Sequence, residues 1–237
     1  MSKLIYLDNA ATTKTAPEVL EAMLPYLQSS MAILLRSTAS HPITKMSWQN
    51  REKESQPHSV QEQRNLFYSR RIRVWQLALK ATAEAYQNKG KHIITTKIEH
   101  HAILHTCEYL EKKGFEITYI DVDENGILKL DDLKAAIRPD TILISVMFAN
   151  NEIGTIEPIK EIGEIAHKHG ILFHTDAVQA FGQVPINVDE CHIDMLSASG
   201  HKLNGPKGIG FLYIRKGVKI RSFVHGGAQE GKRRAGT

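Results

Sequence analysis

Three apolar stretches of this sequence are each followed by side chains that could act together on one ligand. Lys202 follows one of them in SASGHKLNGPKGIG, Asp176 and Gln179 lie in FHTDAVQAFG, and Asn151 lies in FANNEIGTIEPI. A lysine amine can form a Schiff base with an aldehyde, and a carboxylate can keep a pyridine nitrogen protonated. These groups are therefore suited to an aromatic aldehyde cofactor, pyridoxal phosphate.

Each of these residues also has an ordinary structural role. An aspartate after a strand commonly caps a turn, and a His-Lys pair is commonly solvated. The functional interpretation depends on finding the residues together and in this order.

The chain around them alternates amphipathic stretches with short apolar runs. Helical spacing marks residues 17–27, 77–91, 102–114, 130–137 and 159–170, and apolar runs predict strands at 92–96, 115–122, 141–148, 171–177, 193–199 and 209–215. This order predicts an α/β fold, a three-layer α/β/α sandwich with a mainly parallel sheet. Ligands of such sheets bind beyond the carboxyl ends of the strands, where the polar residues fall.

Length and composition fit one large domain. The 237 residues, 42% of them hydrophobic, can bury a substantial core. No apolar run reaches the roughly 18 residues that cross a bilayer, and no signal peptide precedes the first motif, so we expect a cytoplasmic protein without membrane contact. Cys107 and Cys191 lie far apart without metal-ligand spacing, so neither a disulfide nor a metal site is expected.

The formal charge of +4 is concentrated in one window, residues 31–76. This window holds eight Lys or Arg residues against three Glu, so the rest of the chain is close to neutral. A basic face that binds nucleic acid is therefore not expected. The window also lacks clear helical or strand periodicity.

Five motifs resemble those of the cysteine desulfurases, enzymes of the class V aminotransferase fold that supply sulfur for iron–sulfur clusters. They are YLDNAATT, EHHAIL, NNEIGTIEPI, HTDAVQA and SASGHKLNGPKGIGFLYIR, and the match covers residues 6–30 and 77–237. The resemblance implies the large domain of pyridoxal-phosphate-dependent fold type I and a homodimer. It also implies L-cysteine as substrate, alanine and an enzyme persulfide as products, and an iron–sulfur scaffold protein as sulfur acceptor.

The resemblance implies roles for residues around the cofactor ring. Lys202 is similar to the lysine that forms the Schiff base, and Asp176 to the partner of the ring nitrogen. Gln179 is similar to the partner of the ring hydroxyl, with Asn151 beside it. His100 resembles the histidine that stacks on the ring, where an imidazole can also move protons. Lys202 and His100 are thus the expected catalytic residues.

Another group of residues is similar to those that hold the cofactor phosphate. Ser199, Gly200 and His201 directly precede the lysine and complete the expected cofactor-binding set. Thr237 resembles a threonine that the other subunit of the dimer supplies. His101 has no such role and is expected to be a surface residue at a helix start.

The chain departs from the family pattern at its C-terminal end. In the family, the mobile loop with the nucleophilic cysteine, the arginine that binds the substrate carboxylate and the small domain all come later than residue 237. We therefore expect the C-terminal small domain to be absent and the chain to be inactive as given. The alternatives are another fold-type-I enzyme, such as a selenocysteine lyase or a small-amino-acid aminotransferase, and a non-catalytic dimerisation partner.

The window 31–76 is the second departure. Codons compatible with residues 31–36, read one base away, give YGNPSS, and those compatible with residues 64–76 give the glycine-rich EIYFTAGGSESGN. Both are family-like texts at the expected places, so we interpret the window as a frameshift, with a true insertion as the alternative. The expected organisation is an N-terminal segment of the fold (1–30), the aberrant window (31–76) and the cofactor-binding large domain (77–237).

Overall fold

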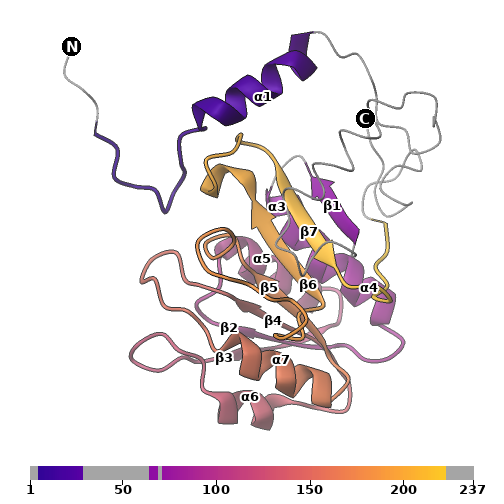
Figure 1. Cartoon of the computed structure of the whole chain (residues 1–237). Helices are drawn as coiled ribbons and strands as arrows, with labels where there is room; N and C mark the ends of the chain where they lie inside the picture. Colours follow the sequence, from indigo (N-terminus) through magenta and orange to yellow (C-terminus); the bar gives the residue numbers. More distant parts are fainter. Residues whose placement is uncertain (1–4, 29–63, 69–70, 223–237) are drawn as a thin grey trace.

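The computed structural model describes residues 5–28, 64–68 and 71–222, and within these ranges a seven-stranded sheet forms the centre (Figure 1). The strand order is β1-β7-β6-β5-β4-β2-β3. The strands are β1 (Arg64–Tyr68), β2 (His92–Thr96), β3 (Glu116–Ile120), β4 (Thr141–Met147), β5 (Leu172–Asp176), β6 (Met195–Ser199) and β7 (Gly210–Ile214). Strands β2 to β6 pair in parallel, whereas β7 runs antiparallel to both β6 and β1. The predicted mainly parallel sheet is confirmed.

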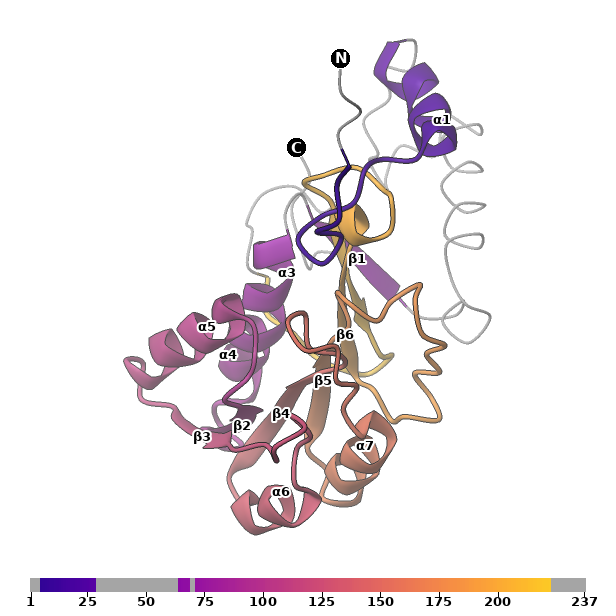
Figure 2. The same ribbon diagram turned by 90° about the vertical axis from the view of Figure 1, so that its left-hand side faces the viewer.

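Helices cover both faces of this sheet (Figure 2). One face carries α3 (Arg71–Gln76), the π-helix η2 (Leu77–Ala81), α4 (Thr82–Tyr86) and α5 (His101–Glu111), and the other carries α6 (Leu130–Ala136) and α7 (Ile159–Lys168). The three layers predicted from the sequence are therefore present.

The alternation of apolar side chains along the strands builds a core on each face. Ile93 and Leu143 belong to the core under α3 to α5, and their neighbours Ile94 and Ile144 belong to the core under α6 and α7. Successive side chains of a strand point to opposite faces, so a strand such as β4, which is buried at every position, faces a core on both sides.

Residues 31–76 show no clear helical or strand periodicity, yet the end of this window forms regular structure. Strand β1 pairs along its whole length with β7, and α3 leads directly into η2. The predicted helix 77–91 accordingly starts earlier, at Arg71, and its last helical residue is Tyr86. Val74 and Trp75 are buried against the sheet, so tertiary packing sets this helix where the local sequence pattern is weak. Residues 31–63 and 69–70 lie outside the described part of the chain.

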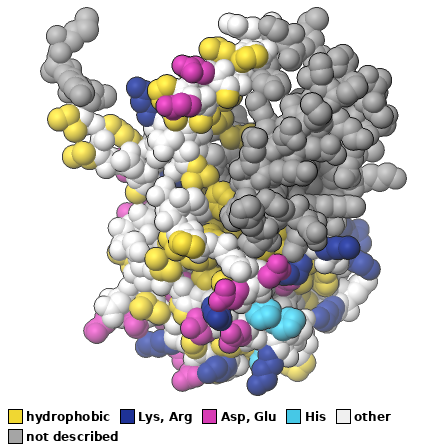
Figure 3. All heavy atoms as spheres, in the orientation of Figure 1, with side chains coloured by type: hydrophobic (Ala, Val, Ile, Leu, Met, Phe, Trp, Pro, Cys, Tyr) yellow, Lys and Arg dark blue, Asp and Glu magenta, His cyan; other side chains and the backbone are white. Residues whose placement is uncertain are grey.

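Helix α1 (Pro17–Gln28) stands away from the sheet, as Figures 1 and 2 both show. The segment before it crosses the carboxyl ends of the strands. At the opposite end of the molecule, around α6 and α7, charged side chains of both signs are mixed over the face seen in Figure 3. Among the described helices, none combines the length and the apolar character that a membrane crossing requires.

Candidate active site

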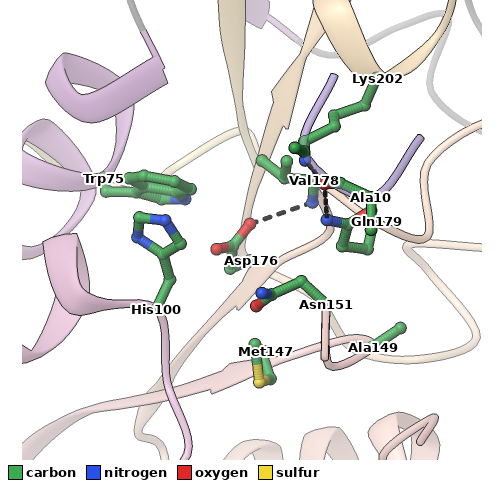
Figure 4. Close-up of a pocket in the computed structure, with 11 residues that line it drawn as sticks. Ala10, Trp75, His100, Met147, Ala149, Asn151, Asp176, Val178, Gln179 and Lys202 are labelled. Atoms are coloured by element: carbon green, nitrogen blue, oxygen red, sulfur yellow. Dashed lines mark hydrogen bonds between the residues drawn. The ribbon is translucent and has the colours of Figure 1, made fainter. Parts of the chain in front are cut away.

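A cavity of about 190 Å³ lies beyond the carboxyl ends of β4, β5 and β6. Its lining includes five residues singled out in the sequence: His100, Asn151, Asp176, Gln179 and Lys202. Figure 4 shows that their side chains come from separate segments and surround one space. Neighbouring parallel strands end at the same edge of a sheet, so residues far apart in the chain meet there. We call Asn151, Asp176, Gln179 and Lys202, which follow these three strands, the site floor.

Asp176 is the last residue of β5 and is only 5% exposed. Its Oδ1 accepts a hydrogen bond of 3.0 Å from the backbone N–H of Val178, and its backbone carbonyl accepts one of 2.8 Å from the N–H of Phe148. The carboxylate is thus held by the backbone while it faces the cavity (Figure 4). A fixed anion in a buried cavity is suited to binding a cationic group.

Lys202 lies in the short 3-10 turn η3 (Gly200–Lys202) that follows β6, and its side chain is buried. Its Nζ donates a hydrogen bond to the carbonyl oxygen of Ala10. Gln179 Nε2 donates to the same oxygen over 3.0 Å. Two groups of the site floor therefore hold the N-terminal segment over the cavity.

Further hydrogen bonds fix this N-terminal segment to the turn that carries the lysine. The backbone N–H and the hydroxyl of Thr13 both donate to the carbonyl of His201, each over 2.8 Å. His201 Nδ1 lies 2.9 Å from the Thr12 hydroxyl. The predicted phosphate residue His201 thus contacts the N-terminal segment.

Ser199 and Gly200, the other residues expected near the phosphate, lie at the end of β6. Ser199 is buried, and its hydroxyl has no hydrogen-bond partner among the described residues. Gly200 leaves no room for a side chain, because a Cβ there would lie 2.7 Å from Ile209 Cγ2. Thr237 lies outside the described residues.

His100 caps the N-terminus of α5, where its Nδ1 accepts a hydrogen bond of 3.1 Å from the N–H of Ala102. A backbone N–H only donates, so the neutral imidazole carries its proton on Nε2. His101 is the first residue of α5 and is exposed.

Trp75, which the sequence analysis did not assign to the site, packs on His100. Their ring centroids are 4.6 Å apart with an angle of 34° between the planes. We call residues 71–86, the run of α3, η2 and α4 that carries Trp75, the helical wall. Trp75 lies in none of the five motifs and in a window without clear periodicity. A large aromatic residue close before a helical stretch was the signal available.

Asn151 lines the cavity while its neighbour Asn150 shapes the loop after β4. Asn150 Oδ1 accepts hydrogen bonds from the N–H groups of Glu152 and Ile153 over 2.8 and 3.2 Å. Asn151 Nδ2 donates to Glu152 Oε1 over 2.7 Å. Hydrogen bonds of the two asparagine side chains thus stabilise the conformation of this loop.

A hydrogen-bonded triad lies below the floor, across three neighbouring strands. His174 Nδ1 lies 2.8 Å from Ser145 Oγ and its Nε2 lies 2.8 Å from Ser197 Oγ. Burial lowers the pKa of His174 to about 3, so this imidazole is neutral in the folded chain at ordinary pH. The polar interior therefore continues from the floor into the sheet.

Neither cysteine of the chain lines the cavity. Cys107 is buried in α5, and burial raises the pKa of its thiol above the ordinary value. Burial also raises the pKa of the Cys191 thiol, which is partly buried. Thiols with raised pKa values are poor nucleophiles. In the described ranges no cluster of three or more His, Cys, Asp or Glu side chains could hold a metal ion.

The groups around the cavity fit pyridoxal phosphate. The floor supplies the amine, the carboxylate and the amide that an aldehyde, a ring nitrogen and a ring hydroxyl require. Ser199, Gly200 and His201, the residues expected at the phosphate, do not line this cavity. The indole of Trp75 covers one face of His100. A ligand ring that stacks on His100 must therefore use the other face or displace the indole.

The chain matches the family described as "Aminotransferase class-V" over residues 5–233. It is 54% identical over 241 residues to "Cysteine desulfurase IscS" of Methanosarcina thermophila, covering 100% of this chain and 59% of the relative. It is 52% identical over 238 residues to the protein of the same name in Clostridium botulinum (strain Kyoto / Type A2), covering 100% of this chain and 60% of the relative.

Solved structures match as well. "SspA in complex with cysteine" has a TM-score of 0.90 at 38% identity and covers 99% of this chain and 68% of that one. A "NIFS-LIKE PROTEIN" also has a TM-score of 0.90 at 38% identity, covering 98% of this chain and 65% of that one. The chain spans about 60% of the length of the curated relatives it matches.

Proposed function

This chain belongs to the class V aminotransferase family, and we propose that it is the cofactor-binding part of a cytoplasmic cysteine desulfurase. The substrate of the whole enzyme would be L-cysteine, the products alanine and a persulfide. The sulfur would pass to an iron–sulfur scaffold protein. The similarity to the two curated cysteine desulfurases supports this proposal.

Pyridoxal phosphate, when bound, withdraws electrons from the substrate carbon that is attached to the amino group. Lys202 would hold the cofactor covalently through Nζ and, once released, take a proton from that carbon. Asp176 would hold the proton on the ring nitrogen, since its carboxylate is fixed by the Val178 N–H. Gln179 would bind the ring hydroxyl, with Asn151 beside it.

His100 would orient the ring by stacking and can move a proton at Nε2. Ser199, Gly200 and His201 would form the protein side of the phosphate site, and Thr237 of a second subunit would complete it in a homodimer. Lys202 and Gln179 must release the Ala10 carbonyl before they can bind the cofactor.

The observation that carries the proposal is the convergence of Asp176, Gln179 and Lys202 on one buried cavity. Its test is covalent labelling. The full chain is incubated with pyridoxal phosphate, reduced with borohydride and digested, and the modified peptide is identified by mass spectrometry.

We expect the label on Lys202 and its complete loss in Lys202→Ala. Lys207→Ala is the matched control, because Lys207 lies exposed in the same loop, and it should keep the label. A label on Lys207, or one spread over surface lysines, would contradict the proposal.

A second candidate is a non-catalytic dimerisation partner. It is favoured by the position of Cys107 and Cys191, neither of which lines the cavity. We propose that residues 1–237 alone release no alanine from cysteine and form no persulfide. Turnover above a protein-free blank that is lost in Lys202→Ala would show that the chain is a complete catalyst.

A further inference from the structure

Glu99 is a buried carboxyl group beside the cavity to which the proposed function gives no role. It directly precedes His100 and is 5% exposed. Its Oε1 accepts hydrogen bonds from the Met147 N–H over 2.7 Å and from the Thr96 hydroxyl over 3.0 Å. Its Oε2 is buried and has no hydrogen-bond partner among the described residues. Oε1 therefore accepts two hydrogen bonds, whereas Oε2 is buried and accepts none from the described residues.

The bond to Met147 brings Glu99 close to Asp176. Met147 and Asp176 are register partners in the parallel ladder of β4 and β5. The next N–H of β4, that of Phe148, donates to the carbonyl of Asp176 over 2.8 Å. Neighbouring strands lie about 4.8 Å apart. Glu99 and Asp176 therefore bind adjacent N–H groups of β4, from opposite sides of the strand.

In the described part of the chain, no positive charge is among the groups that act on the Glu99 carboxyl. The groups that act on it are the Thr96 hydroxyl, the Met147 N–H, and the carboxyls of Asp176 and Glu157, and on α5 it faces the Cys107 thiol. Burial, with a contribution from the charge of Asp176, raises the pKa of Glu99 to about 8. Ionising both of two nearby buried carboxyls costs free energy, because their negative charges repel each other. The carboxyl in the more apolar setting therefore keeps its proton.

Asp176 has the setting that favours the charged form. Its Oδ1 accepts a backbone N–H, and its side chain faces the cavity, where a cationic ligand can bind. We propose that Glu99 and Asp176 form a carboxyl pair with a single proton on Glu99, which keeps Asp176 as the anion of the site. Glu99 is in this sense a positioning residue. The inference rests on the proposed function, because that function gives Asp176 a cationic ring nitrogen to face.

The first test is the pH dependence of unfolding of the full chain without cofactor, compared with Glu99→Gln. In the unfolded chain Glu99 ionises near pH 4.5, whereas the folded chain keeps its proton to about pH 8. Between these values the folded state binds more protons, so stability falls as pH rises. The unfolding constant of the parent, relative to that of Glu99→Gln, should grow about tenfold per pH unit from pH 5 to 8. A ratio independent of pH would overturn the proposal.

The second test asks whether the two carboxyls form a pair. In an Asp176→Asn background the neighbouring charge is gone, so the pH at which the Glu99 effect levels off should move downward. Glu157→Gln is the matched control, and it is made in a Glu99→Gln background because Glu157 also acts on Glu99. Glu157 is also buried and accepts a hydrogen bond from the Leu128 N–H over 2.9 Å, and the charge that acts on it is that of Asp123. Its pH effect should not respond to Asp176→Asn. An unchanged Glu99 profile in that background would overturn the pairing.

The third measurement does not depend on an unfolding equilibrium. Infrared spectra at pH 7 should contain the carbonyl band of a protonated carboxyl in the parent chain and lack it in Glu99→Gln. Its absence in the parent would overturn the proposal. If pyridoxal phosphate fails to bind while the band is present, the proposed function fails and the carboxyl pair stands. If the cofactor labels Lys202 and the band is absent, the carboxyl pair alone fails.

Discussion

The site floor and the helical wall border the same cavity and differ in what fixes them. The floor residues lie at or just beyond the ends of buried parallel strands, and their polar groups are held by hydrogen bonds, as Asp176 is by the Val178 N–H and Asn151 by the Glu152 side chain. The wall presents an indole, placed by packing against the sheet and His100. The floor therefore carries the polar chemistry, while the wall sets how much room is left for a ligand.

The largest effect on stability should come from removing the Trp75 side chain from the helical wall. Trp75 is 1% exposed, so Trp75→Ala removes a buried indole and should lower the free energy of unfolding by about 3–5 kcal/mol. Urea denaturation measures this loss. Tyr109→Ala, which removes an aromatic residue that is 43% exposed, is the control and should cost about 1 kcal/mol or less. Equal losses would mean that the wall is not packed as described.

A smaller effect, dependent on pH, should come from the polar interior beneath the floor. In the unfolded chain His174 is protonated below about pH 6.5, while the folded chain keeps it neutral down to about pH 3. The unfolded state then binds more protons, so stability falls as pH is lowered through this range. Through His174, lowering the pH from 6.5 to 5 should reduce the free energy of unfolding by about 2 kcal/mol.

Glu99 acts with the opposite sign in that interval, because its folded-state pKa is raised. The comparison is therefore made in a Glu99→Gln background, with and without His174→Gln. The slope should become clearly smaller with His174→Gln, with a remainder from His92, whose pKa burial also lowers. It should persist unchanged with His105→Gln, a change on the exposed face of α5. An undiminished slope in the His174 variant would assign it to other groups.

The contrast between floor and wall also explains what the sequence could predict. Asn151, Asp176 and Lys202 each follow an apolar run, and the ends of parallel strands converge wherever such a sheet forms, so their neighbourhood follows from local pattern. Trp75 reaches His100 because α3 packs on the sheet. No periodicity in residues 31–76 predicts this packing. The contact of Lys202 with the Ala10 carbonyl joins distant parts of the chain, and only the assembled fold supplies it.

Glu99 shows a further limit. The sequence places it in the EHHAIL motif, but its chemistry depends on which groups meet its two oxygens. Those are the Thr96 hydroxyl and the Met147 N–H at Oε1, and at Oε2 no group of the residues that the structure describes. A local pattern does not encode that difference.

The smallest effect on stability should come from the floor itself. Asp176→Asn keeps an oxygen that can accept the Val178 N–H, so the free energy of unfolding should change by less than about 1 kcal/mol. The same change should clearly weaken retention of pyridoxal phosphate, measured by equilibrium dialysis, because an amide cannot hold a proton on the ring nitrogen. A large loss of stability with unchanged retention would make Asp176 a structural residue.

The most direct measurement of the central claim, that the strand-end carboxylate holds the cofactor, is the protonation state of the ring nitrogen. Pyridoxal phosphate labelled with ¹⁵N in the ring is fixed on the chain with borohydride and observed by NMR. We expect the chemical shift of a protonated nitrogen in the parent chain, up to a higher pH than for the free reduced cofactor, and its loss in Asp176→Asn. The same shift and the same titration in both proteins would contradict the account.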